Sequence, residues 1–236
     1  MVSPLRSRGP IEMTSTIDAI EQVEAHLDDL LGSLSEDEWC TPTIVTGWEV
    51  RHVAAHLLDT ASRKLAIVRD GFFTEAPASG AADDVRVFVD RLNADGVRVY
   101  GRLSPAVVRL LMAPVSSHLC RYHRGLDPMA PAAFAVSWAG ERESANWFDT
   151  ARELTERWHH QAQIRLALNR PPLFARALYH PVLDCFMRVL PYTYRDVDAS
   201  PGTWISVRVD GEAGDEWQLS RQDGRWSLVE GADGAP

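Results

Sequence analysis

The chain has 236 residues, of which 45% are hydrophobic, and a formal net charge of -9, so it has room for a substantial core in one large domain or in a main domain with a small one. This acidic balance excludes a broad basic surface for phosphate backbones, and we expect no nucleic-acid partner. Three scattered cysteines exclude a disulfide framework, and the lack of a signal-peptide segment or of an apolar run of roughly 20 residues predicts a cytoplasmic protein with no membrane partner.

The first half of the chain predicts four amphipathic helices, because apolar residues recur there at three- and four-residue steps. We expect these helices over residues 14–34, 48–69, 83–103 and 104–122, with loops at 38–47 and 71–82. The core face of the third helix is expected to consist of Val85, Phe88, Val89, Leu92, Val99 and Leu103.

Three positions set the expected limits of these helices. Thr46 is the predicted cap of the second helix. The fourth helix is predicted to begin at Ser104-Pro105, since proline is tolerated in the first turn of a helix. Pro114 is expected to kink this helix or to end it.

The second half of the chain changes its period near residue 172. A strong helical pattern covers residues 144–169 and ends at Pro171-Pro172, and a further helix is expected over residues 175–189. Apolar and polar residues then alternate over 204–209, 216–221 and 225–229, with Asp223-Gly224 as a typical hairpin turn. These segments predict a small antiparallel sheet of three strands.

This change of period predicts the fold class and the domains. We expect a mainly α protein, with a helical bundle over residues 1–172 followed by a small α+β domain over residues 173–236. The last residues, 231–236, are expected to be disordered.

Three pairs of histidines are the first candidates for chemistry: His52 and His56, His118 and His123, and His159 and His160. A single histidine on a helix is more often a surface residue or a hydrogen-bonded core residue than a metal ligand. Each pair therefore needs a further feature before it indicates a site.

Glu156 and His160 have such a feature, because side chains four residues apart lie on one face of a helix and can bind the same ion. The same spacing is also common for a solvated surface pair. The periodicity places both residues opposite the apolar stripe of their helix, which by itself favours the surface pair.

His56 is the candidate for a third ligand from another helix. It lies at the flank of the apolar stripe of its helix, beside Val53, whereas His52 lies further round and is expected at the surface. Two ligands from one helix and a third from a second helix, with one position left open, form the arrangement that a catalytic zinc-type site requires.

Two segments resemble the mycothiol-dependent maleylpyruvate isomerase family, a branch of the DinB-like superfamily. The first is the segment GWEVRHVAAHL, which ends at Leu57, and the second is ARELTERWHHQ, which ends at Gln161. The resemblance implies a DinB-like metal-binding four-helix bundle whose ligands are His56, Glu156 and His160. His159 is the rival for the last of these, although its spacing from Glu156 is three.

The end of the chain also resembles this family. Leu190-Pro191-Tyr192, followed by a three-strand segment that ends in Asp223-Gly224-Arg225-Trp226, is similar to its small sterol-carrier-like C-terminal domain. That domain contributes an arginine to the active site of the family, and Arg221 and Arg225 are the catalytic candidates that the resemblance gives here.

The resemblance further implies a divalent metal, with zinc expected for mixed imidazole and carboxylate ligands, and a thiol cosubstrate, either mycothiol or another low-molecular-weight thiol. The partners would be this small-molecule thiol and a small electrophilic substrate, and the activity that of an isomerase or an S-transferase. Cys40 is close enough in sequence to the second helix to approach the site, but an incidental cysteine is the simpler interpretation.

Two other functions remain open at this stage. One is a non-catalytic metal- or ligand-binding stress protein of the DinB-like superfamily. The other is a metal-dependent hydrolase, in which the open position on the metal holds an activated water. A serine hydrolase built on Ser116, Ser117 and His118 is discounted, because the chain lacks a Gly-x-Ser-x-Gly elbow between a strand and a helix.

Overall fold

The computed structural model describes residues 6–230, which form two compact units. One unit consists of residues 20–125 and 156–172, and is called the helical unit below. The other consists of residues 6–19, 126–155 and 173–230, and is called the sheet unit. The helices α1 (Met13–Gly32) and α6 (Asn146–Ala167) run through both units.

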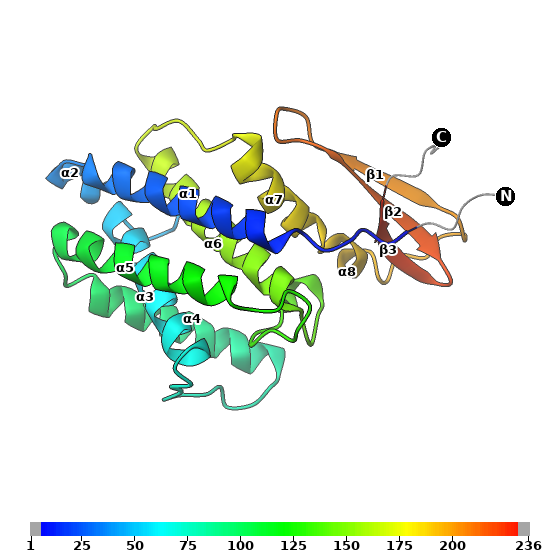
Figure 1. The fold of residues 1–236 in the computed structure, drawn as a ribbon, viewed down its shortest axis with the longest axis horizontal. Helices are drawn as coiled ribbons and strands as arrows, with labels where there is room; N and C mark the ends of the chain where they lie inside the picture. The colour runs from blue at the N-terminus through cyan, green and yellow to red at the C-terminus, as the bar shows by residue number, and fades with distance from the viewer. Residues whose placement is uncertain (1–5, 231–236) are drawn as a thin grey trace. The chain divides into compact units, whose positions relative to one another are not determined.

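The helical unit is built from α1 and α6 together with four further helices (Figure 1). These are α2 (Glu36–Trp39), α3 (Val50–Val68), α4 (Ala82–Tyr100) and α5 (Pro105–Arg124). A shared apolar core joins Leu27 and Leu31 of α1, Leu57 of α3, Met112 of α5 and Ile164 of α6. Burial of these side chains against one another supplies the main drive for the bundle.

Three details of this unit differ from the sequence-based expectations for helix limits. The short helix α2 lies partly in the expected loop, and a capping box between Ser35 and Glu38 supports it. Helix α3 begins after Glu49 rather than after Thr46, with the Glu49 amide donating to His52 Nδ1 at 3.0 Å. Helix α5 continues through Pro114, which is exposed, so this proline does not end the helix.

The expected core face of α4 is wrong, because its residues are exposed or only half-buried. Val85, Val89 and Val99 are 37%, 40% and 48% exposed, while Phe88, Leu92 and Leu103 are only half-buried. The contact of α4 with α3 is instead partly polar, because Arg63 donates to Asn93 at 2.8 Å. Gly96, which is buried, leaves room for Asp59 of α3, since a Cβ at this position would lie 2.2 Å from its carboxyl carbon.

The sheet unit contains α7 (Arg176–Met187), α8 (Leu190–Thr193) and a three-stranded antiparallel sheet in the order β1-β2-β3 (Figure 1). The strands are β1 (Trp204–Arg208), β2 (Glu216–Gln222) and β3 (Arg225–Val229). Asp223 and Gly224 both have positive φ, as a tight two-residue hairpin requires. The inward-facing residues Trp217, Leu219, Trp226 and Leu228 pack with Leu183 of α7.

The N-terminal segment adds to the edge of this sheet, which the sequence did not predict. Ser7 pairs with Val229 in an antiparallel bridge, and the Arg8 amide donates to the Leu228 carbonyl at 2.9 Å. The Arg8 side chain also forms a 2.7 Å ion pair with Asp184 of α7. Ser7 and Arg8 therefore extend the sheet and join it to α7.

The predicted fold class is confirmed, since the chain is mainly helical and ends in a small antiparallel sheet. Within residues 6–230 no helix is long and apolar enough to cross a membrane. The division into domains at residue 172 stays a prediction, and the expected disorder of residues 231–236 concerns positions outside the described residues.

Candidate metal centre

The helical unit brings His56 of α3 next to His160 of α6. The two imidazole rings meet edge to face, with 4.7 Å between their centroids. His56 is only 5% exposed, and the indole of Trp48 also lies close to it, with the ring centroids 5.2 Å apart. Two histidines more than 100 residues apart in sequence thus share one site.

Glu156 completes the predicted group of three. Its Oε2 lies 3.4 Å from His160 Nε2, across one turn of α6. The Glu156 side chain is 48% exposed and that of His160 only 14% exposed, so this pair lies between solvent and the buried His56. The pair is therefore more than a solvated surface pair, because one of its members also contacts a buried imidazole.

Gln163 fixes the orientation of His160, and sequence reasoning missed this residue. Its Oε1 lies 2.9 Å from His160 Nδ1, which donates to it, and His160 Nε2 faces Glu156 from the other side of the ring. Its Nε2 lies 3.0 Å from His159 Nε2 and donates to it. His159, the rival ligand, thus has its Nε2 lone pair engaged, which favours His160.

The protonation of His56 also suits a metal ligand. Burial, followed by the charge of the neighbouring His160, lowers the pKa of His56 from 6.5 to about 4, although the charge of Glu156 opposes this shift. The ring is therefore neutral at pH 7. Its Nδ1 is buried and accepts no hydrogen bond from any residue among 6–230.

These residues fit a divalent cation in their chemistry. Two imidazoles and a carboxylate form a donor set that zinc and similar ions prefer. As the side chains stand, however, no group of three or more His, Cys, Asp or Glu side chains in the described part of the chain is arranged to hold a metal ion. Closure of the three donors around a cation would need side-chain rotation, and the Glu156 side chain is 48% exposed.

The two candidate arginines belong to the sheet unit. The Arg221 side chain is 12% exposed, lies 3.4 Å from Asp198, and covers the ring of Trp226 at 5.8 Å. Arg225 is exposed at the start of β3. Their part in catalysis stays a prediction.

The remaining candidates lie outside this group. Cys40 is exposed, whereas Cys120 and Cys185 are buried, and burial raises the pKa of the Cys185 thiol to about 12. Ser116 donates to Glu24 at 2.7 Å, so its hydroxyl serves a carboxylate rather than a catalytic base. His52, expected at the surface, is half-buried and caps the start of α3.

The chain matches one protein-family model over more than half of its length. Residues 20–165 match the family model described as the mycothiol maleylpyruvate isomerase N-terminal domain. No curated protein matches the chain.

Solved structures give a similar result for the fold. The crystal structure of a mycothiol-dependent maleylpyruvate isomerase superposes with a TM-score of 0.54 at 14% identity, over 81% of this chain and 75% of that one. A histidine-to-alanine mutant of a mycothiol-dependent maleylpyruvate isomerase gives a TM-score of 0.51 at 13% identity, with the same coverage. At such identities the likeness concerns the fold alone.

Proposed function

Since the chain belongs to the family of the mycothiol maleylpyruvate isomerase N-terminal domain, we propose that it is a metal-dependent isomerase or S-transferase that joins a low-molecular-weight thiol to a small electrophile. The observation that supports this proposal most directly is the meeting of His56 and His160 edge to face, with Glu156 3.4 Å from His160.

The proposed metal ligands are His56, Glu156 and His160. A bound divalent cation, for which we propose zinc, would lower the pKa of a coordinated thiol and so supply a thiolate nucleophile at neutral pH. His56 contributes a ring that is neutral at pH 7 because its pKa is about 4. Gln163 holds His160 with Nε2 facing Glu156, which supplies a negative charge.

The proposed isomerisation needs neither an oxidant nor a reductant. The thiolate sulfur would add to one carbon of a cis double bond conjugated to a carbonyl, and the electron pair of that bond would move onto the carbonyl oxygen as an enolate. The new single bond would rotate, and collapse of the enolate would re-form the double bond as trans and expel the thiolate. In a transferase the sulfur would remain on the substrate and displace a leaving group. Arg221 or Arg225 is proposed to bind an anionic group of the substrate, for which a guanidinium is well suited.

The test is turnover with and without each component. Purified protein would be incubated with maleylpyruvate, the compound in the names of the relatives, together with mycothiol, bacillithiol or glutathione, and substrate and free thiol would be followed. The proposal predicts turnover that needs a thiol, stops on addition of a chelator and returns with Zn²⁺.

The other outcomes separate the alternative functions. Turnover without any thiol would contradict the proposal and indicate a metal-dependent hydrolase. Stoichiometric metal without turnover of maleylpyruvate or of other small electrophiles, with any of the three thiols, would indicate a non-catalytic binding protein.

A further inference from the structure

We propose that Arg157 is a positioning residue for the metal ligands, an inference that rests on the proposed function. In this role it would hold the two ligand-bearing helices, α3 and α6, in register within the helical unit. Arg157 follows Glu156 directly on α6, yet it is only 1% exposed. A guanidinium is rarely buried to this extent unless partners compensate its charge.

The partners of Arg157 connect α6 to α3 beside the ligands. Its Nη1 donates to the backbone carbonyl of Leu57 at 3.4 Å, and Leu57 directly follows His56 on α3. The same nitrogen lies 3.2 Å from Glu24 Oε1 of α1. The buried side chain of the residue after Glu156 thus binds the backbone of the residue after His56.

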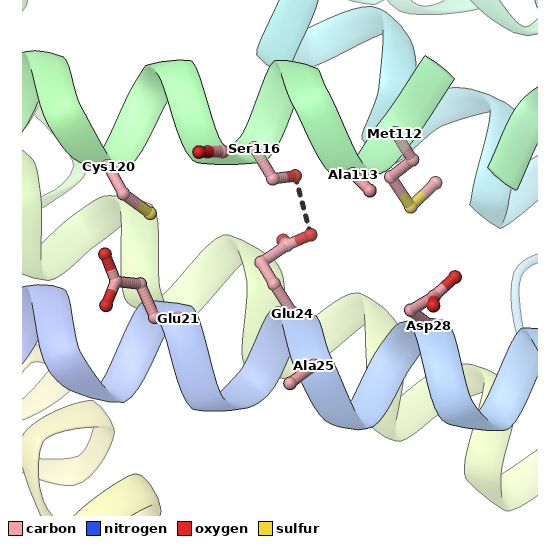
Figure 2. Close-up of a pocket in the computed structure, with 9 residues that line it drawn as sticks. Glu21, Glu24, Ala25, Asp28, Met112, Ala113, Ser116 and Cys120 are labelled. Atoms are coloured by element: carbon pink, nitrogen blue, oxygen red, sulfur yellow. Dashed lines mark hydrogen bonds between the residues drawn. The ribbon is translucent and has the colours of Figure 1, made fainter. Parts of the chain in front are cut away.

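Glu24 is in turn held from a fourth helix. Its second oxygen, Oε2, accepts a 2.7 Å hydrogen bond from Ser116 of α5 (Figure 2). Glu21 and Asp28, which flank Glu24 on α1, pair with other arginines, Arg124 at 2.9 Å and Arg109 at 3.1 Å. Glu24 is therefore the carboxylate of this row that meets Arg157.

This chain of contacts, Ser116 to Glu24 to Arg157 to the Leu57 carbonyl, joins α5, α1, α6 and α3 at the level of the site. A buried ion pair contributes little net stability, because desolvation offsets the attraction, but it disfavours other packing arrangements. Here it would fix how far His56 lies from the pair Glu156 and His160. Glu24 would also cancel the positive charge of Arg157, which otherwise repels an incoming cation.

The test measures metal binding rather than turnover. Protein freed of metal by a chelator, which is then removed, would be titrated with Co²⁺, whose visible absorption reports the number and geometry of its ligands. The melting temperature of the metal-free protein would be recorded alongside. Arg157→Met should weaken Co²⁺ binding about 10- to 100-fold, as for other residues that support metal ligands, and alter the absorption spectrum. Arg157→Lys, which keeps the charge but loses the planar fork, should fall between wild type and Arg157→Met.

A matched control separates positioning from lost stability. Leu119→Ala removes a buried side chain of the same unit, packed against Ala61 and Leu65, and should lower the melting temperature without changing the Co²⁺ affinity or spectrum. If Arg157→Met fails to fold, Glu24→Gln, which keeps the shape of the partner and removes its charge, takes its place and should also weaken binding.

Equal Co²⁺ affinity and spectra for wild type and Arg157→Met, or for wild type and Glu24→Gln, would overturn this inference and leave the proposed function intact. Weakened binding in Leu119→Ala to the same degree would overturn it as well. A wild-type protein that binds no Co²⁺ would overturn both this inference and the proposed metal centre.

Discussion

Burial makes His56 differ from an ordinary histidine. A ring that is 5% exposed and lies beside a second imidazole is costly to protonate, and its pKa falls to about 4. Protonation would also remove the lone pair that a metal needs. The same burial therefore keeps the ring available as a ligand and links the stability of the fold to pH.

This linkage gives a prediction for the metal-free protein. The unfolded chain binds a proton at His56 near pH 6.5, whereas the folded chain does so only near pH 4. Above pH 6.5 the group has no effect on stability. As the pH falls from 6.5 to 4, it should reduce the free energy of unfolding by up to about 3 kcal/mol, with no further loss below that.

Urea denaturation of wild type and His56→Gln across this pH range checks the prediction. Other groups titrate in the same window, so the quantity of interest is the difference between the two proteins. As the pH falls from 6.5 to 4, the free energy of unfolding should decrease more for wild type than for His56→Gln. A difference that is flat between pH 6.5 and 4 would show that the folded-state pKa of His56 is not depressed.

At the scale of secondary structure elements, Asp184 joins three parts of the sheet unit. It lies on α7, forms ion pairs with Arg8 at 2.7 Å and with Arg188 at 2.8 Å, and accepts a 2.7 Å hydrogen bond from the indole of Trp217 on β2. Burial favours protonation of this carboxyl, but the combined effect of these partners holds its pKa below the usual value.

We predict that Asp184→Ala destabilises the sheet unit by about 3–5 kcal/mol, because it leaves the Arg188 guanidinium and the Trp217 indole without their shared acceptor. Urea denaturation followed by tryptophan fluorescence measures this loss. Asp210→Ala is the matched control, since Asp210 forms an exposed ion pair with Arg208 and should cost less than about 1 kcal/mol. Equal effects of the two substitutions would contradict the role given to Asp184.

Sequence periodicity predicted the elements that have a clear apolar face. The long helices and all three strands lie close to their expected positions, since a period of 3.6 or 2 follows directly from burying one face. The limits of α3 and the exposure of α4 were wrong, because both depend on contacts outside the element: the Glu49 to His52 cap and the approach of Asp59 to Gly96. Pro114, which is exposed, did not end α5.

The site was predictable in a different way. Spacing alone could place Glu156 and His160 on one face of a helix, and the apolar stripe of the second helix made His56 a candidate. No local pattern says which helices face each other, so the grouping of the three came from a family resemblance. Gln163 and Arg157 were missed because glutamine and arginine are normally solvent-exposed residues. Only the packing of the helices shows that Gln163 is turned towards His160 and that Arg157 is buried.

At the scale of the whole molecule, metal binding and substrate binding are assigned to different parts of the chain. The proposed ligands His56, Glu156 and His160 all belong to the helical unit, while Arg221 and Arg225 belong to the sheet unit. Metal binding therefore tests the helical unit alone, without any assumption about the substrate. If the ion binds the folded state alone, it should also stabilise the fold, by roughly 2.7 kcal/mol at a free concentration of 100 times its Kd.

Elemental analysis of the purified protein tests the central claim most directly. After dialysis against a slight excess of Zn²⁺ and removal of free ion, wild type and the control His52→Ala should each hold about one ion per chain, as expected for a single site with three protein ligands. His56→Ala should hold almost none. The same metal content in wild type and His56→Ala, or no retained metal in wild type, would contradict the assignment of these residues as a metal centre.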